Sequence, residues 1–376
     1  MTESDFITSE RAVTLPGLFR ERVRRTPDRV AYKHFDSAGQ TWVDSSWREM
    51  ESEIGRWQSA LSRTGLRPGD RVAMMLPNSR EWVLFDQAAM GLGFVTVPLY
   101  TDDRAENAAY ILQNAGARLV LVEGKHQWQA LLETDRGLPT VEHILTLAPV
   151  ADGERAVDSR VQSLHEWLPE DVAPARRVDV SPDTLATIVY TSGTTGHPKG
   201  VMLSHKNILS NASYALKSVD LRKEAETFLS FLPLSHTLER TIGYYLAIMV
   251  GGTVAFNRSV KQLPEDLMHI RPTVLISVPR IYERVYTRVM ESVPNQSALR
   301  RVLFRLTLQT GWRRCLHRQG QASWSPWLVL WPALSRLVAS KIIGRLGGRI
   351  RFAICGGAAL QPDINRFFVS MGLPLL

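Results

Sequence analysis

Residues 190–200 read Tyr-Thr-Ser-Gly-Thr-Thr-Gly-His-Pro-Lys-Gly and directly follow the apolar run 185–189. The glycines let the backbone approach a ligand closely, the hydroxyl groups offer hydrogen-bond donors, and Lys199 adds a positive charge. Together these features predict a cradle for phosphate groups. Pro198 and the preceding apolar run favour a defined loop over a flexible linker of Ser, Gly and Thr.

This stretch is not a Walker A loop. A Walker A loop places four residues between its glycines and a Lys-Ser or Lys-Thr pair directly after the second one. Here Gly193 and Gly196 enclose two residues, and Lys199 precedes a glycine. The predicted cradle is therefore of another kind.

Short apolar segments alternate with amphipathic ones along most of the chain. The alternation predicts an α/β fold, with mostly parallel sheets covered by helices on both faces. With 376 residues, 44% of them hydrophobic, the chain is long enough for more than one subdomain. The predicted strands are 30–35, 40–44, 71–76, 94–99, 118–122, 141–147, 185–190, 227–232, 253–256, 274–278 and 349–354. The predicted helices are 46–64, 79–92, 105–115, 126–133, 204–218, 239–250, 280–292 and one that starts at 363.

Composition divides the chain further. Residues 1–13 are expected to form an N-terminal tail, ahead of a helix that begins at Thr14. Residues 148–183 are rich in Pro, Asp, Glu and Arg and show little periodicity, which predicts a connector and a seam between subdomains. Arginine and tryptophan are concentrated in 295–348, which predicts a basic, Trp-rich helical insertion.

Charge and cysteine content limit the class of protein. The net charge of +8 and the pI near 9.6 favour polyanionic partners such as nucleotides, CoA, anionic membranes or nucleic acid. Cys315 and Cys355 cannot form a disulfide framework and lack metal-ligand spacing, as is typical of a reducing compartment. The first eleven residues lack the plan of a secretory signal. We therefore expect a cytoplasmic protein.

Residues 191–200 resemble the signature loop of the adenylate-forming superfamily, which includes acyl-CoA synthetases, luciferases and peptide-synthetase adenylation domains. The resemblance implies that this loop closes over the β- and γ-phosphates of ATP. It assigns catalytic roles to Thr191 and Lys199 and leaves His197 as a variable position. The nucleotide-binding residues that it implies here are Thr191, Ser192, Gly193, Thr194, Thr195, Gly196 and Lys199.

A second stretch, 231–240, reads Phe-Leu-Pro-Leu-Ser-His-Thr-Leu-Glu-Arg and is similar to another core motif of the superfamily. The resemblance implies that His236 lies between the nucleotide and acyl sites, with a catalytic role. The Ser-His-x-x-Glu-Arg pattern is similar to that of the long-chain branch. Taken alone, His236 could equally be a helix-capping or a satisfied core histidine.

A third stretch, 355–360, reads Cys-Gly-Gly-Ala-Ala-Leu and resembles the Ser-Gly-Gly-Ala-Pro-Leu segment that lines the adenine pocket in the family. The resemblance implies that Gly356, Gly357 and Ala358 contact the nucleotide. Cys355 replaces the usual Ser, and Ala359 replaces the usual Pro. The glycine pair could alternatively be a plain strand-to-helix turn.

The resemblance extends over nearly the whole chain and implies an AMP-forming acyl-CoA synthetase of the long-chain type. It implies two stacked, mostly parallel sheet subdomains, in an AMP-binding domain over 14–376 that is incomplete at its C-terminus. The family's Mg²⁺-holding Tyr-Gly-x-Thr-Glu motif, its ribose ligand and its C-terminal lid domain would follow Leu376. No residue of this chain is therefore assigned to a metal.

The implied substrates are a fatty acid, ATP and CoA, with Mg²⁺ as the metal. Three hypotheses stay open: a truncated long-chain fatty acid–CoA ligase, a non-catalytic fragment that binds nucleotide or acyl chain, and a fatty-acyl-AMP ligase that serves a carrier protein. The basic, Trp-bearing segment 295–345 suggests peripheral contact with an anionic membrane, since Trp and Arg suit the interface and the headgroups. A solvated helical insertion is the alternative, and nucleic-acid binding is disfavoured.

Overall fold

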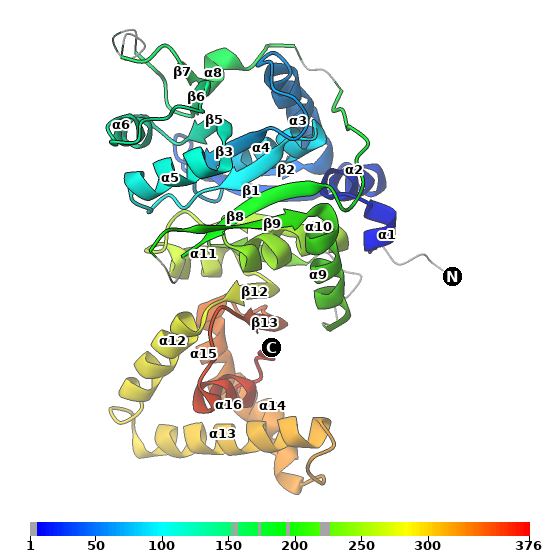
Figure 1. Ribbon diagram of the computed structural model, residues 1–376. Coiled ribbons are helices and arrows are strands. Elements are labelled where there is room, and N and C mark those ends of the chain that lie inside the picture. Colours follow the sequence, from blue (N-terminus) through cyan, green and yellow to red (C-terminus); the bar gives the residue numbers. More distant parts are fainter. Residues whose placement is uncertain (1–5, 152, 154–156, 172–173, 193–195, 219–225) are drawn as a thin grey trace. The chain divides into compact units, whose positions relative to one another are not determined.

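The computed structural model describes residues 6–376 except for 152, 154–156, 172–173, 193–195 and 219–225. The chain divides into two compact units, and Figure 1 labels many of their elements. The first unit comprises 1–225 and 233–256, and the second comprises 226–232 and 257–376. The seam predicted at 148–183 does not coincide with these boundaries, because that whole stretch belongs to the first unit.

A seven-stranded sheet with the order β7-β6-β5-β3-β4-β8-β9 dominates the first unit. All its pairs are parallel except β8 with β9. Its strands are β3 (Arg71–Met75), β4 (Val95–Pro98), β5 (Ala117–Val122), β6 (His143–Thr146), β7 (Val161–Ser163), β8 (Leu185–Thr191) and β9 (Lys199–Ser204). The predicted α/β fold with mostly parallel pairing is confirmed.

Helices cover both faces of this sheet, because the chain reverses its direction across it. From β3 to β4 the chain moves one way, and from β4 to β5 it returns past β3. Right-handed crossovers then place α4 (Arg80–Gly91) and α5 (Ala105–Ala115) on opposite faces. A buried cluster with Val120, Val122, Leu112 and Trp128 packs α5 and α6 (Lys125–Leu132) onto one face.

A smaller group of strands, β11-β1-β2, also belongs to the first unit. The predicted hairpin is confirmed: β1 (Val30–Asp36) pairs antiparallel with β2 (Thr41–Ser46), and β11 (Thr253–Phe256) pairs parallel with β1. Ser46 caps α3 (Trp47–Leu61) in a capping box with Glu49. The remaining helices of this unit are α1 (Ser9–Ala12), α2 (Leu15–Arg25), α8 (Leu164–Trp167), α9 (His205–Ser218), the π-helix η1 (Glu239–Leu246) and α10 (Ala247–Val250).

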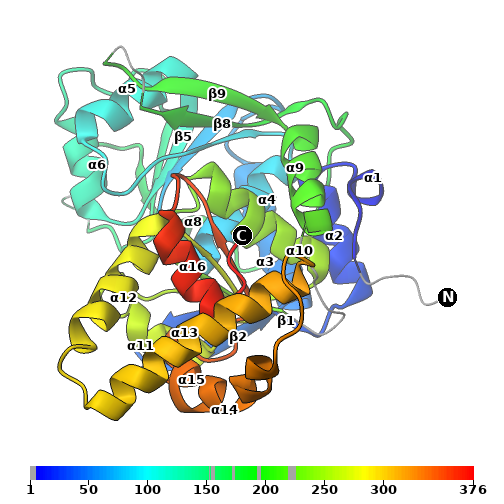
Figure 2. The ribbon, with the colours of Figure 1, turned by 90° about the horizontal axis from the view of Figure 1, so that it is seen from below.

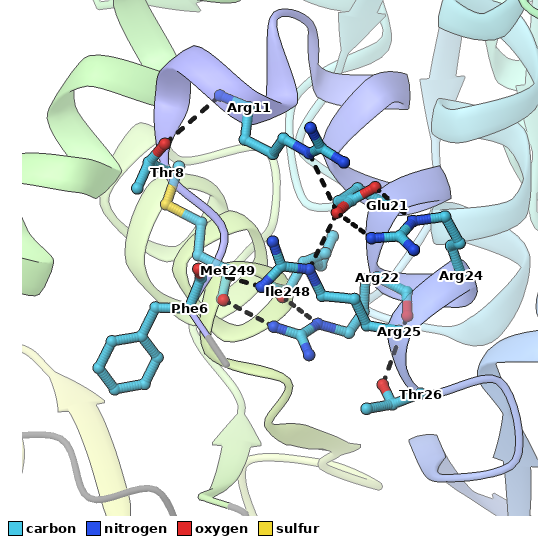
Figure 3. Close-up of polar contacts among 10 residues, drawn as sticks. All are labelled: Phe6, Thr8, Arg11, Glu21, Arg22, Arg24, Arg25, Thr26, Ile248 and Met249. Carbon is cyan, nitrogen blue, oxygen red and sulfur yellow. Dashed lines mark hydrogen bonds and ion pairs between the residues drawn. The ribbon is translucent and has the colours of Figure 1, made fainter. Parts of the chain in front are cut away.

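Residues 6–13 of the predicted N-terminal tail pack against the first unit, which corrects that part of the prediction, and residues 1–5 lie outside the described residues. Ile7 and Ala12 are buried, and the Ile7 N–H donates to the carbonyl of Met249 at 3.0 Å. In Figure 3 the buried Arg22 reaches the same region, where its guanidinium donates to the carbonyls of Ile248 at 3.0 Å and Met249 at 2.8 Å. These carbonyls end α10, and a cation there suits the helix C-terminus.

The second unit contains three parallel strands in the order β13-β12-β10. In Figure 2 helix α16 lies between α12 and α13, whose residues it contacts. Gly311 on α13 makes this packing close, since a Cβ there would lie 1.8 Å from the Ser370 carbonyl oxygen. The elements are β10 (Thr227–Ser230), α11 (Leu263–Ile270), β12 (Val274–Ser277), α12 (Pro279–Ser292), α13 (Ala298–Arg318), β13 (Phe352–Cys355) and α16 (Pro362–Ser370).

The insertion predicted at 295–348 is helical, as expected. After the 21-residue α13, a broken helical run joins η2 (Pro326–Leu330), α14 (Trp331–Leu334), η3 (Ser335–Ala339), α15 (Ser340–Ile343) and η4 (Gly344–Leu346). Among the described residues this run alone, Pro326–Leu346, is long and apolar enough to span a membrane by length and composition. A single run of this kind is weak evidence for a span.

Candidate active site

Strands β8 and β9 form an antiparallel hairpin at the edge of the seven-stranded sheet, and Thr191 and Lys199 lie at the end of it, on either side of the predicted loop. Thr191 and Lys199 are direct cross-strand partners. The structure thus brings together the two loop residues predicted to be catalytic. Both are exposed, as are Ser192 and Gly196, so their polar groups face solvent. Gly193, Thr194 and Thr195 lie outside the described residues.

Tyr190 fixes the hairpin one residue before Thr191. Its hydroxyl donates to Oδ1 of Asn114 on α5 at 2.6 Å, and its cross-strand partner is Gly200. A Cβ at Gly200 would lie 2.9 Å from Cγ2 of Ile188 and 3.0 Å from Cζ of Tyr190. The glycine that ends the motif is therefore required by close packing across the hairpin, beyond any contact with a ligand.

His197 packs against the same helix. Its ring stacks on Tyr110 of α5 with centroids 4.9 Å apart, and the Arg136 guanidinium lies 5.3 Å from the Tyr110 centroid. These contacts support one side of the tip and leave Lys199 exposed on β9.

A buried arginine, Arg240, connects the hairpin to the rest of the first unit. Its Nη1 donates to Oγ1 of Thr187 on β8 at 2.7 Å, and its Nη2 donates to Oγ1 of Thr96 on β4 at 2.9 Å. The same Nη2 forms an ion pair with the buried carboxylate of Asp86 on α4. Tyr245 completes the group by donating to Oδ2 of Asp86 at 2.7 Å. The guanidinium of Arg240 on η1 thereby joins strands β4 and β8 and helix α4.

Burial and pairing have opposite effects on these two ionisable groups. Burial raises the pKa of Asp86, and the charge of Arg240 and the donated hydrogen bonds oppose this rise. Burial lowers the pKa of Arg240, but Asp86 and Tyr245 outweigh it and leave that pKa above its ordinary value. Arg240 therefore stays charged, and removing either partner would leave an uncompensated charge in the core.

His236 lies one turn before Arg240. Its carbonyl accepts from the Arg240 N–H at 3.0 Å, and its Nδ1 accepts from the Leu238 N–H at 3.2 Å. The side chain is exposed, so it is not a satisfied core histidine, although its Nδ1 does bond the local backbone. The turn before it is fixed by Asn78, whose Oδ1 accepts from the Leu234 N–H at 2.8 Å. The position of His236 thus follows from Arg240 and Asn78.

Gly356, Gly357 and Ala358 follow β13 in the second unit, which is described separately from the hairpin. The Gly356 N–H donates to the carbonyl of Ser277 at 3.0 Å. Gly357 has a φ of +83°, which a residue with a Cβ adopts at a cost. Burial raises the pKa of the Cys355 thiol beside them, which favours the unreactive thiol over the thiolate. The segment presents backbone groups and little side-chain bulk.

The sequence does not indicate the partners of Arg240, although Arg240 itself lies within the second motif. Asp86, Thr96 and Thr187 come from three separate elements, and no local pattern marks them. Within the described ranges, no group of three or more His, Cys, Asp or Glu could hold a metal ion.

Comparison with known proteins gives one family and several relatives. Residues 19–375 match the family model described as AMP-binding enzyme. The long-chain-fatty-acid–CoA ligase FadD15 of Mycobacterium tuberculosis is 31% identical over 361 residues, which cover 94% of this chain and 58% of that protein. Fatty acyl-CoA synthetase A of Dictyostelium discoideum is 34% identical over 315 residues, which cover 82% of this chain and 45% of that protein. The chain spans about half the length of the curated relatives it matches.

Solved structures share the fold. The inhibitor-bound N-terminal domain of FACL13 from Mycobacterium tuberculosis gives a TM-score of 0.70 at 22% identity, covering 96% of this chain and 74% of that one. A fatty acyl CoA synthetase of the same organism gives 0.69 at 21% identity, covering 97% of this chain and 59% of that one. These likenesses agree with the predicted α/β architecture.

A pH dependence of stability follows from His205, the first residue of α9. Its Nδ1 accepts from the Leu15 N–H at 3.3 Å, and burial, together with the charge of Arg240, lowers its pKa to about 4. The unfolded chain binds a proton at this residue below its ordinary pKa of about 6.5, so the stability that the neutral ring contributes is lost as the pH falls towards 4. We expect roughly 3 kcal/mol of unfolding free energy to be lost between pH 7 and 4 through this residue.

Urea unfolding at several pH values measures this effect. His205→Gln should flatten the pH dependence by that amount, whereas His126→Gln, at an exposed position on α6, should leave the wild-type curve unchanged. Equal curves for wild type and His205→Gln would show that His205 is not held neutral in the folded state.

Proposed function

We propose that this chain, which belongs to the family of AMP-binding enzymes, carries the nucleotide-binding part of an enzyme that activates long-chain fatty acids with ATP and CoA. The observation that carries the proposal is the hairpin in which Thr191 and Lys199 lie opposite each other and face solvent. A hydroxyl and a cation at one tip suit the phosphates of a nucleotide. The names of the curated relatives favour a long-chain acyl substrate.

The proposed reaction has two steps. An oxygen of the fatty-acid carboxylate attacks the α-phosphorus of ATP, the bond to the bridging oxygen breaks, and pyrophosphate leaves with that oxygen. The thiol sulfur of CoA then attacks the acyl carbon, AMP leaves with the carboxylate oxygen, and the thiol proton is released. No protein nucleophile is needed, so the enzyme has to position the groups and balance phosphate charge.

Each predicted residue has a proposed part in this scheme. Lys199 and Thr191 would bind the departing phosphates, together with Ser192 and the rest of the loop. His236 would lie between nucleotide and acyl group, held by its backbone contact with Arg240. Gly356–Ala358 would give the adenine an open backbone surface, since neither glycine has a side chain.

Mg²⁺ stays a prediction from the resemblance. The described residues offer no group of three or more His, Cys, Asp or Glu that could hold a metal ion. The cytoplasmic location stays a prediction as well. It rests on the two cysteines, Cys315 and Cys355, which are free.

Two alternatives differ from the proposal in what happens after ATP binds. A non-catalytic module would bind nucleotide without forming acyl-AMP. A fatty-acyl-AMP ligase would form acyl-AMP but pass the acyl group to a carrier protein. The CoA-ligase names of the relatives favour transfer to CoA.

We also propose peripheral membrane contact through residues 295–345. Several large apolar side chains of this segment are exposed: Leu299 and Val329 by 69%, and Trp324 and Trp327 by 59%. Within the broken run Pro326–Leu346, only 11% of the most apolar 18-residue stretch is buried. An apolar surface that is neither buried nor paired suits a position in the headgroup region of a bilayer.

The charge of this segment supports an anionic membrane as the partner. Residues 295–348 contain no Asp or Glu, and their Lys and Arg are Arg300, Arg301, Arg305, Arg313, Arg314, Arg318, Arg336, Lys341 and Arg345. Basic residues beside an interfacial segment each add about 1 kcal/mol of attraction to an anionic leaflet. Fatty-acid substrates partition into such membranes, so contact would bring the enzyme to its substrate.

The role of Lys199 is tested by ATP binding. Lys199→Ala should weaken ATP binding about 10- to 100-fold, because it removes a charge-assisted contact worth about 1.5–3 kcal/mol. Lys206→Ala is the matched control, since Lys206 is exposed and pairs with Asp183 at 3.3 Å. Isothermal titration calorimetry gives the affinities, and palmitate-dependent pyrophosphate–ATP exchange reports the first step.

Pyrophosphate–ATP exchange in the wild type that is absent from the Lys199→Ala variant would support the proposed activation of fatty acids. ATP binding without any exchange would favour the non-catalytic module for this chain. Equal ATP affinity of the wild type and the Lys199→Ala variant would contradict the role of Lys199.

Membrane contact is tested by flotation with vesicles. Trp324→Ser combined with Trp327→Ser should lower the fraction bound to anionic vesicles several-fold, because it removes two exposed indole rings from the interface. Tyr214→Ser on α9 is the control, since Tyr214 is an aromatic residue exposed by 68% outside the segment. Equal flotation of all three proteins, or equal binding to neutral vesicles, would refute anionic membrane contact through this segment.

A further inference from the structure

Helix α5 contacts the chain on both sides of the predicted phosphate loop. On the side that enters the loop, the Tyr190 hydroxyl donates to Oδ1 of Asn114 at 2.6 Å. On the side that leaves it, the His197 ring stacks on Tyr110, with centroids 4.9 Å apart and ring planes inclined by 25°. Figure 2 shows α5 beside the ends of β8 and β9. One helix thus holds both arms of the loop.

The two contacts come from one face of α5. Tyr110 and Asn114 are four residues apart, which places their side chains one helical turn apart on the same face. The geometry of the helix therefore sets the distance between the two arms. A loop that was held on one arm only would have no such restraint.

Helix α5 does not depend on the loop for its own position. Its residues Ile111 and Leu112 are buried in the cluster that packs this helix onto the seven-stranded sheet. Tyr190 belongs to the same buried cluster, and Tyr110 packs against it. The Arg136 guanidinium, 5.3 Å from the Tyr110 centroid, restrains that ring further. The arms of the loop are therefore held against a fixed part of the fold.

These contacts leave the predicted phosphate-binding groups accessible. Thr191 and Lys199 are exposed and lie opposite each other across the hairpin. Pro198 is the only residue between His197 and Lys199, and its ring fixes its own φ. The orientation of His197 is therefore passed through the backbone to Lys199, while the stack itself stays outside the space that a ligand needs.

We propose that α5 positions Thr191 and Lys199 for the β- and γ-phosphates of ATP. Tyr110, Asn114 and His197 are the positioning residues, and they do not touch the nucleotide. The inference rests on the proposed function, because it takes the loop as the phosphate site. Ordering a loop costs free energy on binding, so contacts that order it beforehand raise the affinity. AMP lacks these two phosphates, so its affinity does not depend on α5.

The test compares the ATP and AMP affinities of full-length variants by isothermal titration calorimetry. His197→Ala removes the stack, and Asn114→Ala removes the acceptor of the Tyr190 hydroxyl. Each should weaken ATP binding about three- to tenfold and leave AMP binding unchanged. His197→Phe keeps an aromatic ring and should retain the ATP affinity of the wild type. Tyr214→Ala is the control, because Tyr214 is an aromatic residue exposed by 68% on α9.

Two further measurements separate positioning from a general loss of stability. His197→Ala and Tyr110→Leu break the same stack, so the double variant should bind ATP no more weakly than either single variant. The urea midpoint of His197→Ala should equal that of the wild type, because His197 is exposed. A lower midpoint together with an ATP affinity that His197→Phe does not restore would overturn the positioning role.

Failure of this inference and failure of the proposed function are separate results. Unchanged ATP affinity in Lys199→Ala contradicts the proposed function. ATP binding that Lys199→Ala weakens, but that His197→Ala and Asn114→Ala leave unchanged, refutes the role of α5 alone. Hydrogen–deuterium exchange without nucleotide gives an independent result: His197→Ala and Asn114→Ala should each speed exchange in β9 several-fold and leave β5 unchanged. Wild-type exchange rates in β9 of both variants would refute the role of α5 whether or not ATP binds.

Discussion

The ion pair of Arg240 and Asp86 is the constraint on which the first unit depends. Both side chains are buried, so each charge has to be compensated inside the protein. The compensation comes from Thr96 and Thr187 on two parallel strands and from Tyr245 on η1. Breaking one partner of such a pair typically costs 3–5 kcal/mol. The pair therefore fixes which strands are neighbours and how η1 lies against them.

Arg240 contacts both segments that carry predicted catalytic residues. Thr187 lies four residues before Thr191 on the same strand, and Arg240 lies four residues after His236. The guanidinium thus connects the base of the phosphate hairpin with the turn that carries His236. Thr191 and Lys199 are exposed, and Gly200 packs against Tyr190 beside them, so the polar groups of Thr191 and Lys199 stay accessible to a ligand.

Much of the fold is readable from the sequence, and the failures have physical reasons. Buried strands such as β5 and capped helices such as α3 carry strong local signals. The sequence does not predict strand β9, because its residues are mostly exposed and show no apolar face. Strand β7 and helix α8, of three and four residues, are too short for a periodic pattern. The described part of the predicted tail, residues 6–13, is instead packed, because Ile7 is buried and its N–H bonds to Met249, a contact between distant segments. The loop motif predicted Thr191 and Lys199, but the partners of Arg240 lie up to 154 residues away in sequence.

Hydrogen–deuterium exchange of wild type and Arg240→Met tests the coupling most directly. If Arg240 holds both segments, its replacement should lower amide protection in β8 and in η1 together, while β5 keeps its wild-type protection. Arg160→Met is the control, because Arg160 pairs locally with Asp158 at 2.7 Å and should leave β8 and η1 unchanged. Loss of protection in η1 alone, or unchanged protection in both segments, would contradict a role for Arg240 in holding the phosphate hairpin and the His236 turn together.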